Sequence, residues 1–146
     1  MFGPPGSVDV YLSYGCHLCL KVVGRTGEAV LIRAIRPEVG VPLMMQRRSQ
    51  SPAIASGPGR VGQALGIGLG DSGQRFGTAD FRLDVGPAAP RLLTGPRIGI
   101  SRATDRPWRF AGLHPRPHCL VRPSFANPHR WVPHPPSPHP PQASLL

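Results

Sequence analysis

The chain has 146 residues, which is enough for one domain but leaves no room for two sizeable cores. Hydrophobic residues make up 40% and aromatic residues 6%, while 18 Gly and 20 Pro form about a quarter of the chain, so much of it must be turn or loop. A formal net charge of +10, in which Lys21 is the only lysine beside the arginines, favours a polyanionic partner and excludes a basic substrate.

The sequence contains no segment typical of a membrane span or an export signal. No apolar run approaches the roughly 18 residues that a span requires, and residues 1–6 lack a basic region followed by an apolar stretch. The three cysteines, an odd number, do not indicate a disulfide framework. We therefore expect a cytoplasmic protein with no membrane partner, associated with the nucleoid if it is bacterial.

The first predicted element is a β-hairpin over residues 8–23. Apolar and polar residues alternate along 8–13, which predicts a half-buried strand. The pair Tyr14-Gly15 is a turn signal, and the stretch 18–23 is β-prone.

Three further elements follow in chain order. The apolar run 29–35, which contains Arg33, predicts a buried central strand, although a single helical turn also fits it. Residues 42–48 predict a helix, with Pro in its first turn and two Arg at its end. Residues 61–67 predict a short helix that is opened by the Gly/Pro loop 56–60.

Two more alternating stretches, 81–85 and 97–101, predict strands. No internal repeat is present, and the strands and helices lack a regular βαβ rhythm. The expected fold is therefore α+β, as a single domain with a curved antiparallel sheet, a hairpin and short helices.

The composition changes near residue 110. Residues 111–146 hold ten of the prolines, five of the six histidines and no acid. Because proline lacks an N–H and fixes φ, this segment predicts a disordered or polyproline-like tail behind a domain at 1–110. A GC-rich gene read out of frame is an alternative origin for such a tail.

Two motif-like patterns predict no cofactor or metal. Residues 68–73 match G-x-G-x-x-G, but a helix precedes them and a polar loop follows, so we interpret them as a flexible loop rather than a nucleotide site. Cys16 and Cys19 match C-x-x-C, but in an extended strand they point to opposite faces, and two further ligands would be needed for zinc. We expect small thiols in a strand and no metal.

The loop 56–60 is the first candidate site. Free N–H groups at a helix start, small residues and the adjacent Arg60 form an anion cradle. An ordinary N-cap with a surface arginine explains the same residues equally well.

The hairpin and the following strand provide further candidates. Tyr11 falls on the polar face, where an aromatic ring can stack on a base, and Tyr14 falls at the tip, where a ring can wedge into a base stack. Cross-strand packing is the alternative role for both rings. Arg33 within an apolar run either has a carboxylate partner or lines a phosphate-binding groove.

These segments together resemble the alkyladenine (3-methyladenine) DNA glycosylase family, in that family's order and at about its spacing over residues 1–110. The segments that carry the resemblance are Met1-Phe2-Gly3-Pro4-Pro5-Gly6, Val10-Tyr11-Leu12-Ser13-Tyr14-Gly15, Glu28-Ala29-Val30-Leu31-Ile32-Arg33-Ala34, Ser56-Gly57-Pro58-Gly59-Arg60 with Gln63-Ala64-Leu65-Gly66-Ile67, Gly95-Pro96-Arg97-Ile98-Gly99-Ile100-Ser101-Arg102-Ala103 and Pro107-Trp108-Arg109-Phe110.

The resemblance implies a hydrolase of base-excision repair that flips an alkylated purine out of duplex DNA and cleaves its N-glycosidic bond. Tyr14 matches the family's intercalating tyrosine, and Tyr11 matches the tyrosine that stacks on the flipped base. Arg33 matches an arginine near the lesion phosphate, with Leu31 beside it. The expected partner is double-stranded DNA with alkylated or deaminated purines, bound by a monomer without a cofactor.

The resemblance also assigns phosphate contacts to a set of residues from the loop before the second helix: Ser56, Gly57, Gly59 and Arg60. Lys21 stands where the family commonly has an asparagine that helps select bases, and Asp9 replaces a more usual aromatic or apolar residue. The family's water-activating glutamate and a pocket histidine lie upstream of the segment at residues 1–6, so no catalytic base is assigned in this chain.

Two alternatives stand beside the glycosylase hypothesis. One is a non-catalytic nucleic-acid-binding remnant, which would bind DNA in a salt-dependent way without preference for a lesion. The other is a product that does not fold, which a cooperative melt followed by circular dichroism would exclude.

The missing carboxylate predicts that the 146-residue chain binds DNA weakly and releases little or no base. The measurement is base release from duplexes that carry hypoxanthine or 3-methyladenine. Robust turnover would contradict the absence of a catalytic base from this chain.

Overall fold

The computed structural model describes residues 1–84, 91–113 and 132–133. These residues divide between two compact units, the first formed by 1–84 and the second by 91–113 with 132–133. Most of the predicted tail, 111–146, lies outside the described residues. Two of its members, Val132–Pro133, pair with a strand of the second unit.

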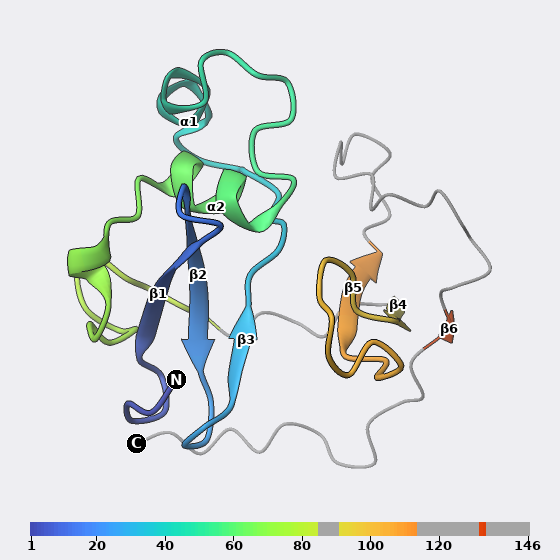
Figure 1. The fold of residues 1–146 in the computed structure, drawn as a ribbon. Helices are drawn as coiled ribbons and strands as arrows, with labels where there is room; N and C mark the ends of the chain where they lie inside the picture. Colours follow the sequence, from blue (N-terminus) through green and yellow to red (C-terminus); the bar gives the residue numbers. More distant parts are fainter. Residues whose placement is uncertain (85–90, 114–131, 134–146) are drawn as a thin grey trace. The chain divides into compact units, whose positions relative to one another are not determined.

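The predicted hairpin is confirmed and forms the centre of the first unit. Strand β1 (Val8–Ser13) pairs with β2 (His17–Val23) in an antiparallel ladder, and β3 (Ala29–Leu31) joins the other edge of β2 (Figure 1). The register runs from Val8 opposite Val22 to Ser13 opposite His17. Directly opposed residues share a face of the sheet. The alternation predicted from the sequence therefore gives the sheet one apolar face and one polar face.

The predicted central strand at 29–35 is wrong in both length and position. Only Ala29–Leu31 form a strand, which lies at an edge of the sheet, and Val30 is 64% exposed. Beyond β3 the backbone turns to a different partner, since Ile35 N–H donates to the Ala55 carbonyl at 3.2 Å. Ile35 therefore packs against Ala55 and α2, whereas Ile32 packs against both that cluster and the residues of the sheet.

Both predicted helices are present. Helix α1 (Val41–Arg47) matches the prediction to within a residue, whereas α2 (Pro58–Leu65) starts three residues earlier than expected, since Pro58 occupies its first turn. Arg47 at the end of α1 donates to the Ala64 carbonyl at 3.1 Å, which satisfies a carbonyl near the C-terminus of α2. The two helices are thereby held together at their carboxyl ends.

Helix α2 packs on β2 through a close approach of the two backbones. A Cβ added at Gly62 would lie 2.1 Å from the carbonyl oxygen of Leu18, so no other residue fits without a shift of the helix. Two buried clusters lie around this contact. One consists of Val8, Val10 and Leu20, and the other of Ala55, Val61 and Ala64.

The segment 68–76 is bonded along the outer edge of β1 rather than being the flexible loop we expected. It contains a 3-10 turn, η1 (Leu69–Asp71), and Gly68 N–H donates to the Asp71 carboxylate at 2.7 Å. Val8 exchanges backbone bonds with this segment, and Ser72 Oγ accepts from Val10 N–H at 3.2 Å. The unpaired edge of β1 is thereby covered.

The predicted strands at 81–85 and 97–101 are wrong for every residue that the structure describes, with Val85 outside that range. Phe81 instead anchors a turn, in which its ring meets Phe76 edge-on at 5.9 Å and its carbonyl accepts from Gly77 N–H. The stretch 97–101 is interrupted by Gly99, whose φ of 70° is incompatible with an extended strand.

The strands of the second unit were not predicted. β4 (Arg91–Gly95) pairs on one side with β5 (Arg109–Leu113) and on the other with β6 (Val132–Pro133). Both sheets are antiparallel and the helices lie outside them, so the α+β class is confirmed. Within the described part of the chain, no helix is long and apolar enough to cross a membrane.

Replacement of Gly62 tests the close approach of α2 to β2. Because the obstructing atom belongs to the backbone, Gly62→Ala is expected to lower the free energy of unfolding by about 1–3 kcal/mol. The matched control is Gly70→Ala, since a Cβ at Gly70 meets nothing within 4 Å and should change stability by less than about 0.5 kcal/mol. Urea unfolding followed by circular dichroism measures both, and equal effects would contradict the packing argument.

Candidate nucleic-acid interface

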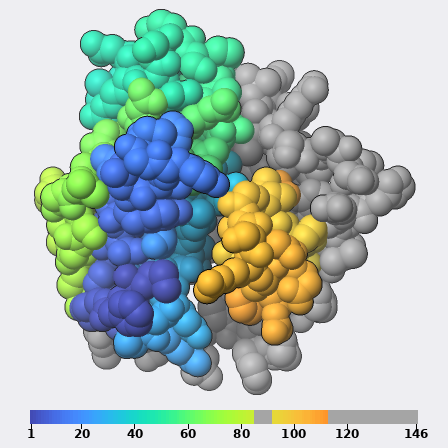
Figure 2. Space-filling view, viewed as in Figure 1, coloured from blue at the N-terminus to red at the C-terminus, as the bar shows by residue number. Residues whose placement is uncertain are grey.

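The hairpin ends in a turn that holds an aromatic ring in solvent. Tyr14 is 85% exposed and adopts a φ of 52°, and Gly15 follows with a φ of 69°. Cys16 N–H closes the turn on the Ser13 carbonyl at 3.2 Å. A bulky residue at positive φ is strained, and strain of this kind concentrates at functional sites. Figure 2 shows atoms of the hairpin, coloured blue, on the face in view.

Tyr11 lies half-buried on the polar face of the sheet, as the alternation predicted. It stands opposite Cys19 in the ladder, and the ammonium of Lys21 lies 4.0 Å from the centre of its ring. Burial raises the pKa of the Tyr11 phenol, and the neighbouring Cys19 thiol raises it further. The charge of Arg33 acts in the opposite direction on this pKa.

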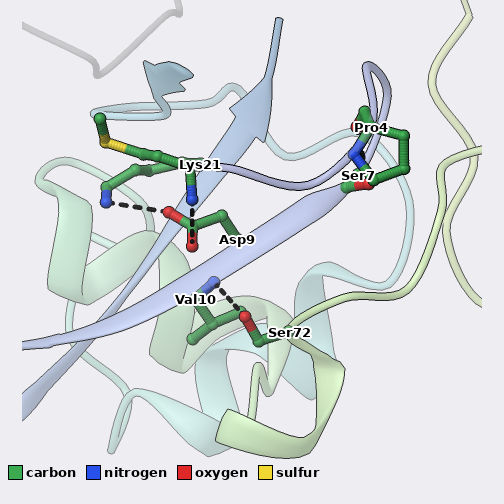
Figure 3. A network of polar contacts seen from close by, with 7 residues as sticks. Pro4, Ser7, Asp9, Val10, Lys21 and Ser72 are labelled. Carbon is green, nitrogen blue, oxygen red and sulfur yellow. Dashed lines mark hydrogen bonds and ion pairs between the residues drawn. The ribbon is translucent and has the colours of Figure 1, made fainter. Parts of the chain in front are cut away.

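An ion pair joins the two strands beside Tyr11. Lys21 Nζ lies 2.9 Å from Asp9 Oδ2, and both side chains are about four-fifths buried (Figure 3). The hydrogen bond from Lys21 holds the pKa of Asp9 below its usual value, against the opposing effect of burial. Asp9 thus fixes the position of the Lys21 ammonium over the ring.

Arg33 and Leu31 lie on the segment that leaves the sheet. Leu31 is opposite Lys21 in the ladder, which places it beside the Tyr11–Lys21 pair. The Arg33 carbonyl accepts from Gly57 N–H at 2.9 Å, so the loop before α2 fixes the backbone at this arginine. Its half-buried guanidinium forms no ion pair with any carboxylate of the described residues, so the carboxylate partner that the sequence analysis left open is not found among them.

The loop before α2 differs from the cradle that we predicted. The Gly57 N–H is bonded to Arg33 and is therefore not free to bind an anion, and the Ser56 carbonyl accepts from the Arg60 guanidinium at 3.1 Å. The helix has no side-chain cap, so the N–H groups of Gly59 and Arg60 have no intrahelical partner. The groups of this loop that can bind a phosphate are these two N–H groups and the exposed Arg60 side chain.

One residue of this surface was missed in the sequence analysis. His17 stands opposite Ser13 at the end of the hairpin, and a Cβ added at Gly59 would lie 2.8 Å from its ring. This contact joins the hairpin tip to the start of α2. The alternation of side chains along the strands could have predicted this position, because it places His17 on the same face of the sheet as Tyr11.

The C-x-x-C pattern splits between two environments. Cys16 is exposed in the hairpin turn, not in a strand as we expected, and Cys19 is buried in β2. Within the ranges that the structure covers, no three His, Cys, Asp or Glu side chains gather as a metal site would require. Cys119 lies outside these ranges.

Comparison with known proteins gives one matching family and several relatives that share a name. The family model described as Methylpurine-DNA glycosylase matches residues 1–114. A protein of Rhizobium meliloti named "Putative 3-methyladenine DNA glycosylase" is 48% identical over 112 residues, which are 75% of this chain and 60% of that protein. Proteins with the same name from Rhodopseudomonas palustris (strain BisB18) and Nitrosospira multiformis are 47% and 49% identical, over 75% and 84% of this chain and 58% and 65% of their own lengths. The chain therefore spans less than two thirds of these relatives.

The Asp9–Lys21 pair predicts a pH-dependent contribution to stability. Because the pKa of Asp9 is lower in the folded state, its contribution is present at neutral pH and disappears as the pH falls below about 4 through that lowered pKa. Asp9→Asn should therefore destabilise the chain by about 1 kcal/mol at neutral pH and by progressively less in acid.

Thermal melts at a series of pH values measure this difference. The control is Asp80→Asn, an exposed carboxyl with no ion pair among the described residues, which should change stability by less than about 0.5 kcal/mol. A penalty for Asp9→Asn that stays constant between neutral and acid pH would contradict the assignment.

Proposed function

The chain belongs to the methylpurine-DNA glycosylase family, and on that basis we propose that it binds double-stranded DNA and acts in the excision of alkylated or deaminated purines. The reaction is hydrolysis of the N-glycosidic bond of a purine turned out of the duplex, in base-excision repair. Water is the only co-reactant, and the proposal includes no cofactor. The protein acts as a monomer on DNA.

The exposed ring of Tyr14 is the observation that supports this proposal most directly. The hairpin turn holds the Tyr14 ring 85% exposed at its tip, where it can enter another molecule. Insertion of such a ring between base pairs unstacks them and lowers the cost of turning one base outward. Tyr14 is therefore the wedge in our proposal.

The polar face beside the wedge is suited to hold the base. Tyr11 supplies a flat, half-buried aromatic ring for stacking, with the Lys21 ammonium over one of its faces and Leu31 opposite Lys21 in the ladder. Arg33, which has no ion-pair partner among the residues described, is available for a backbone phosphate of the flipped nucleotide. Each of these groups binds or positions the DNA, and none is assigned the activation of water.

Phosphate contacts at the start of α2 complete the proposed surface. Ser56 and Gly57 hold the loop by backbone bonds, the N–H groups of Gly59 and Arg60 have no intrahelical partner, and the side chain of Arg60 is exposed. Cations at this position suit a polyanion, in keeping with the net charge of +10. DNA binding by this surface should weaken as the salt concentration rises.

The proposal predicts that the chain binds duplex DNA with a hypoxanthine or an abasic site more tightly than undamaged duplex. Tyr11→Ala and Tyr14→Ala should each reduce this preference by roughly 5- to 100-fold, the value of one base–aromatic stack. Fluorescence anisotropy at several salt concentrations measures it.

The matched control is Phe2→Ala. Phe2 is an aromatic residue of similar exposure, but it lies beside Gly27 at the end of the sheet opposite the hairpin tip, and its loss should leave the preference unchanged. Salt-dependent binding with no preference for a lesion would instead support a non-catalytic nucleic-acid-binding protein.

A further inference from the structure

The chain's single lysine lies against the ring that is proposed to hold the base. Lys21 Nζ is 4.0 Å from the centre of the Tyr11 ring and 2.9 Å from Asp9 Oδ2. Its side chain is only 18% exposed, so the ammonium is held in place rather than moving freely in solvent. The two contacts together fix a positive charge over one face of the Tyr11 ring.

The charges around Tyr11 do not cancel. The Lys21 ammonium lies over the ring, and it shares the Asp9 carboxylate with the Met1 ammonium, which is 3.1 Å from Asp9 Oδ1. The electron-rich face of the tyrosine also already interacts with a cation. A second cation that stacks on this ring must therefore approach a surplus of positive charge or displace Lys21 from Asp9.

The bases that such an enzyme excises fall into two electrostatic classes. Purines alkylated on a ring nitrogen carry a positive charge, whereas deaminated purines such as hypoxanthine are neutral and present a carbonyl oxygen. The lysine ammonium has three donors and no acceptor, so it can donate to a carbonyl oxygen or ring nitrogen of a neutral base. A cationic purine such as 7-methylguanine also has a carbonyl oxygen, but the ammonium charge repels the charge on its ring.

We propose that Lys21 makes this site selective for neutral purines over cationic alkylated purines, a specificity that rests on the proposed function. The cation–π contact with Tyr11 that would otherwise attract a cationic base is already made by Lys21. Asp9 acts as a positioning residue that keeps the ammonium in this place.

The experiment compares the affinity of the 146-residue chain for three duplexes. One carries hypoxanthine, one carries 7-methylguanine and one is undamaged. All three are measured at the same mildly acidic pH, at which 7-methylguanine is fully cationic. The wild-type chain should bind the hypoxanthine duplex roughly tenfold more tightly than the 7-methylguanine duplex. Lys21→Met, which keeps the aliphatic stem, should reduce this ratio to about one or below, and Lys21→Arg should keep it above one.

Two further variants make the result decisive. In Lys21→Met the Asp9 carboxylate keeps the Met1 ammonium as its partner at 3.1 Å. Asp9→Asn combined with Lys21→Met removes the half-buried carboxylate as well, so it decides the matter if Lys21→Met alone is unstable. Arg25→Met removes a cation from the exposed turn between β2 and β3 and should weaken binding to all three duplexes equally, with the ratio unchanged.

The outcomes separate the two proposals. Equal affinity for all three duplexes in the wild type would overturn the proposed function and this inference with it. In a second outcome the chain prefers damaged duplexes, but the ratio of its affinities for hypoxanthine and 7-methylguanine does not change when the Lys21 charge is lost. This outcome would leave the proposed function standing and overturn the specificity. A ratio that falls with Lys21→Met or the double variant, but not with Arg25→Met, would support it.

Discussion

The contact between Gly62 and the Leu18 carbonyl is the constraint on which the rest of the first unit depends. Only a residue without a side chain lets α2 approach β2 so closely, and this approach places the start of the helix beside the hairpin tip. The loop before the helix then reaches Arg33 and fixes its backbone. A single glycine in a core contact thus determines where the arginine and the helix start lie relative to Tyr11.

Local patterns were enough to predict much of this arrangement. The alternation along β1 fixes which residues share a face, so the positions of Tyr11 and Tyr14 followed from a period of two and a turn signal. Proline and arginine at opposite ends of α1 likewise indicate a helix without reference to the fold. These predictions succeeded because each depends on residues that are close in the sequence.

Several of the failures involve partners that are distant in the sequence. The run at 29–35 begins as an edge strand, and its later apolar residues Ile32 and Ile35 pack on Ala55 and α2, a change of partner that no periodicity indicates. The segment 68–76 has the composition of a free loop, yet it is bonded to β1. The lysine above the Tyr11 ring is a diagonal neighbour across the ladder, and its place requires the register and the Asp9 pair together.

The closed turn that carries Tyr14 has a kinetic consequence. Its backbone is fixed by the bond from Cys16 to Ser13 and by two successive residues of positive φ, so the direction of the ring is set when the chain folds. The entropy of ordering this loop is lost before any encounter and does not reduce the affinity for a partner. Association is then limited by diffusion and orientation rather than by a search among loop conformers.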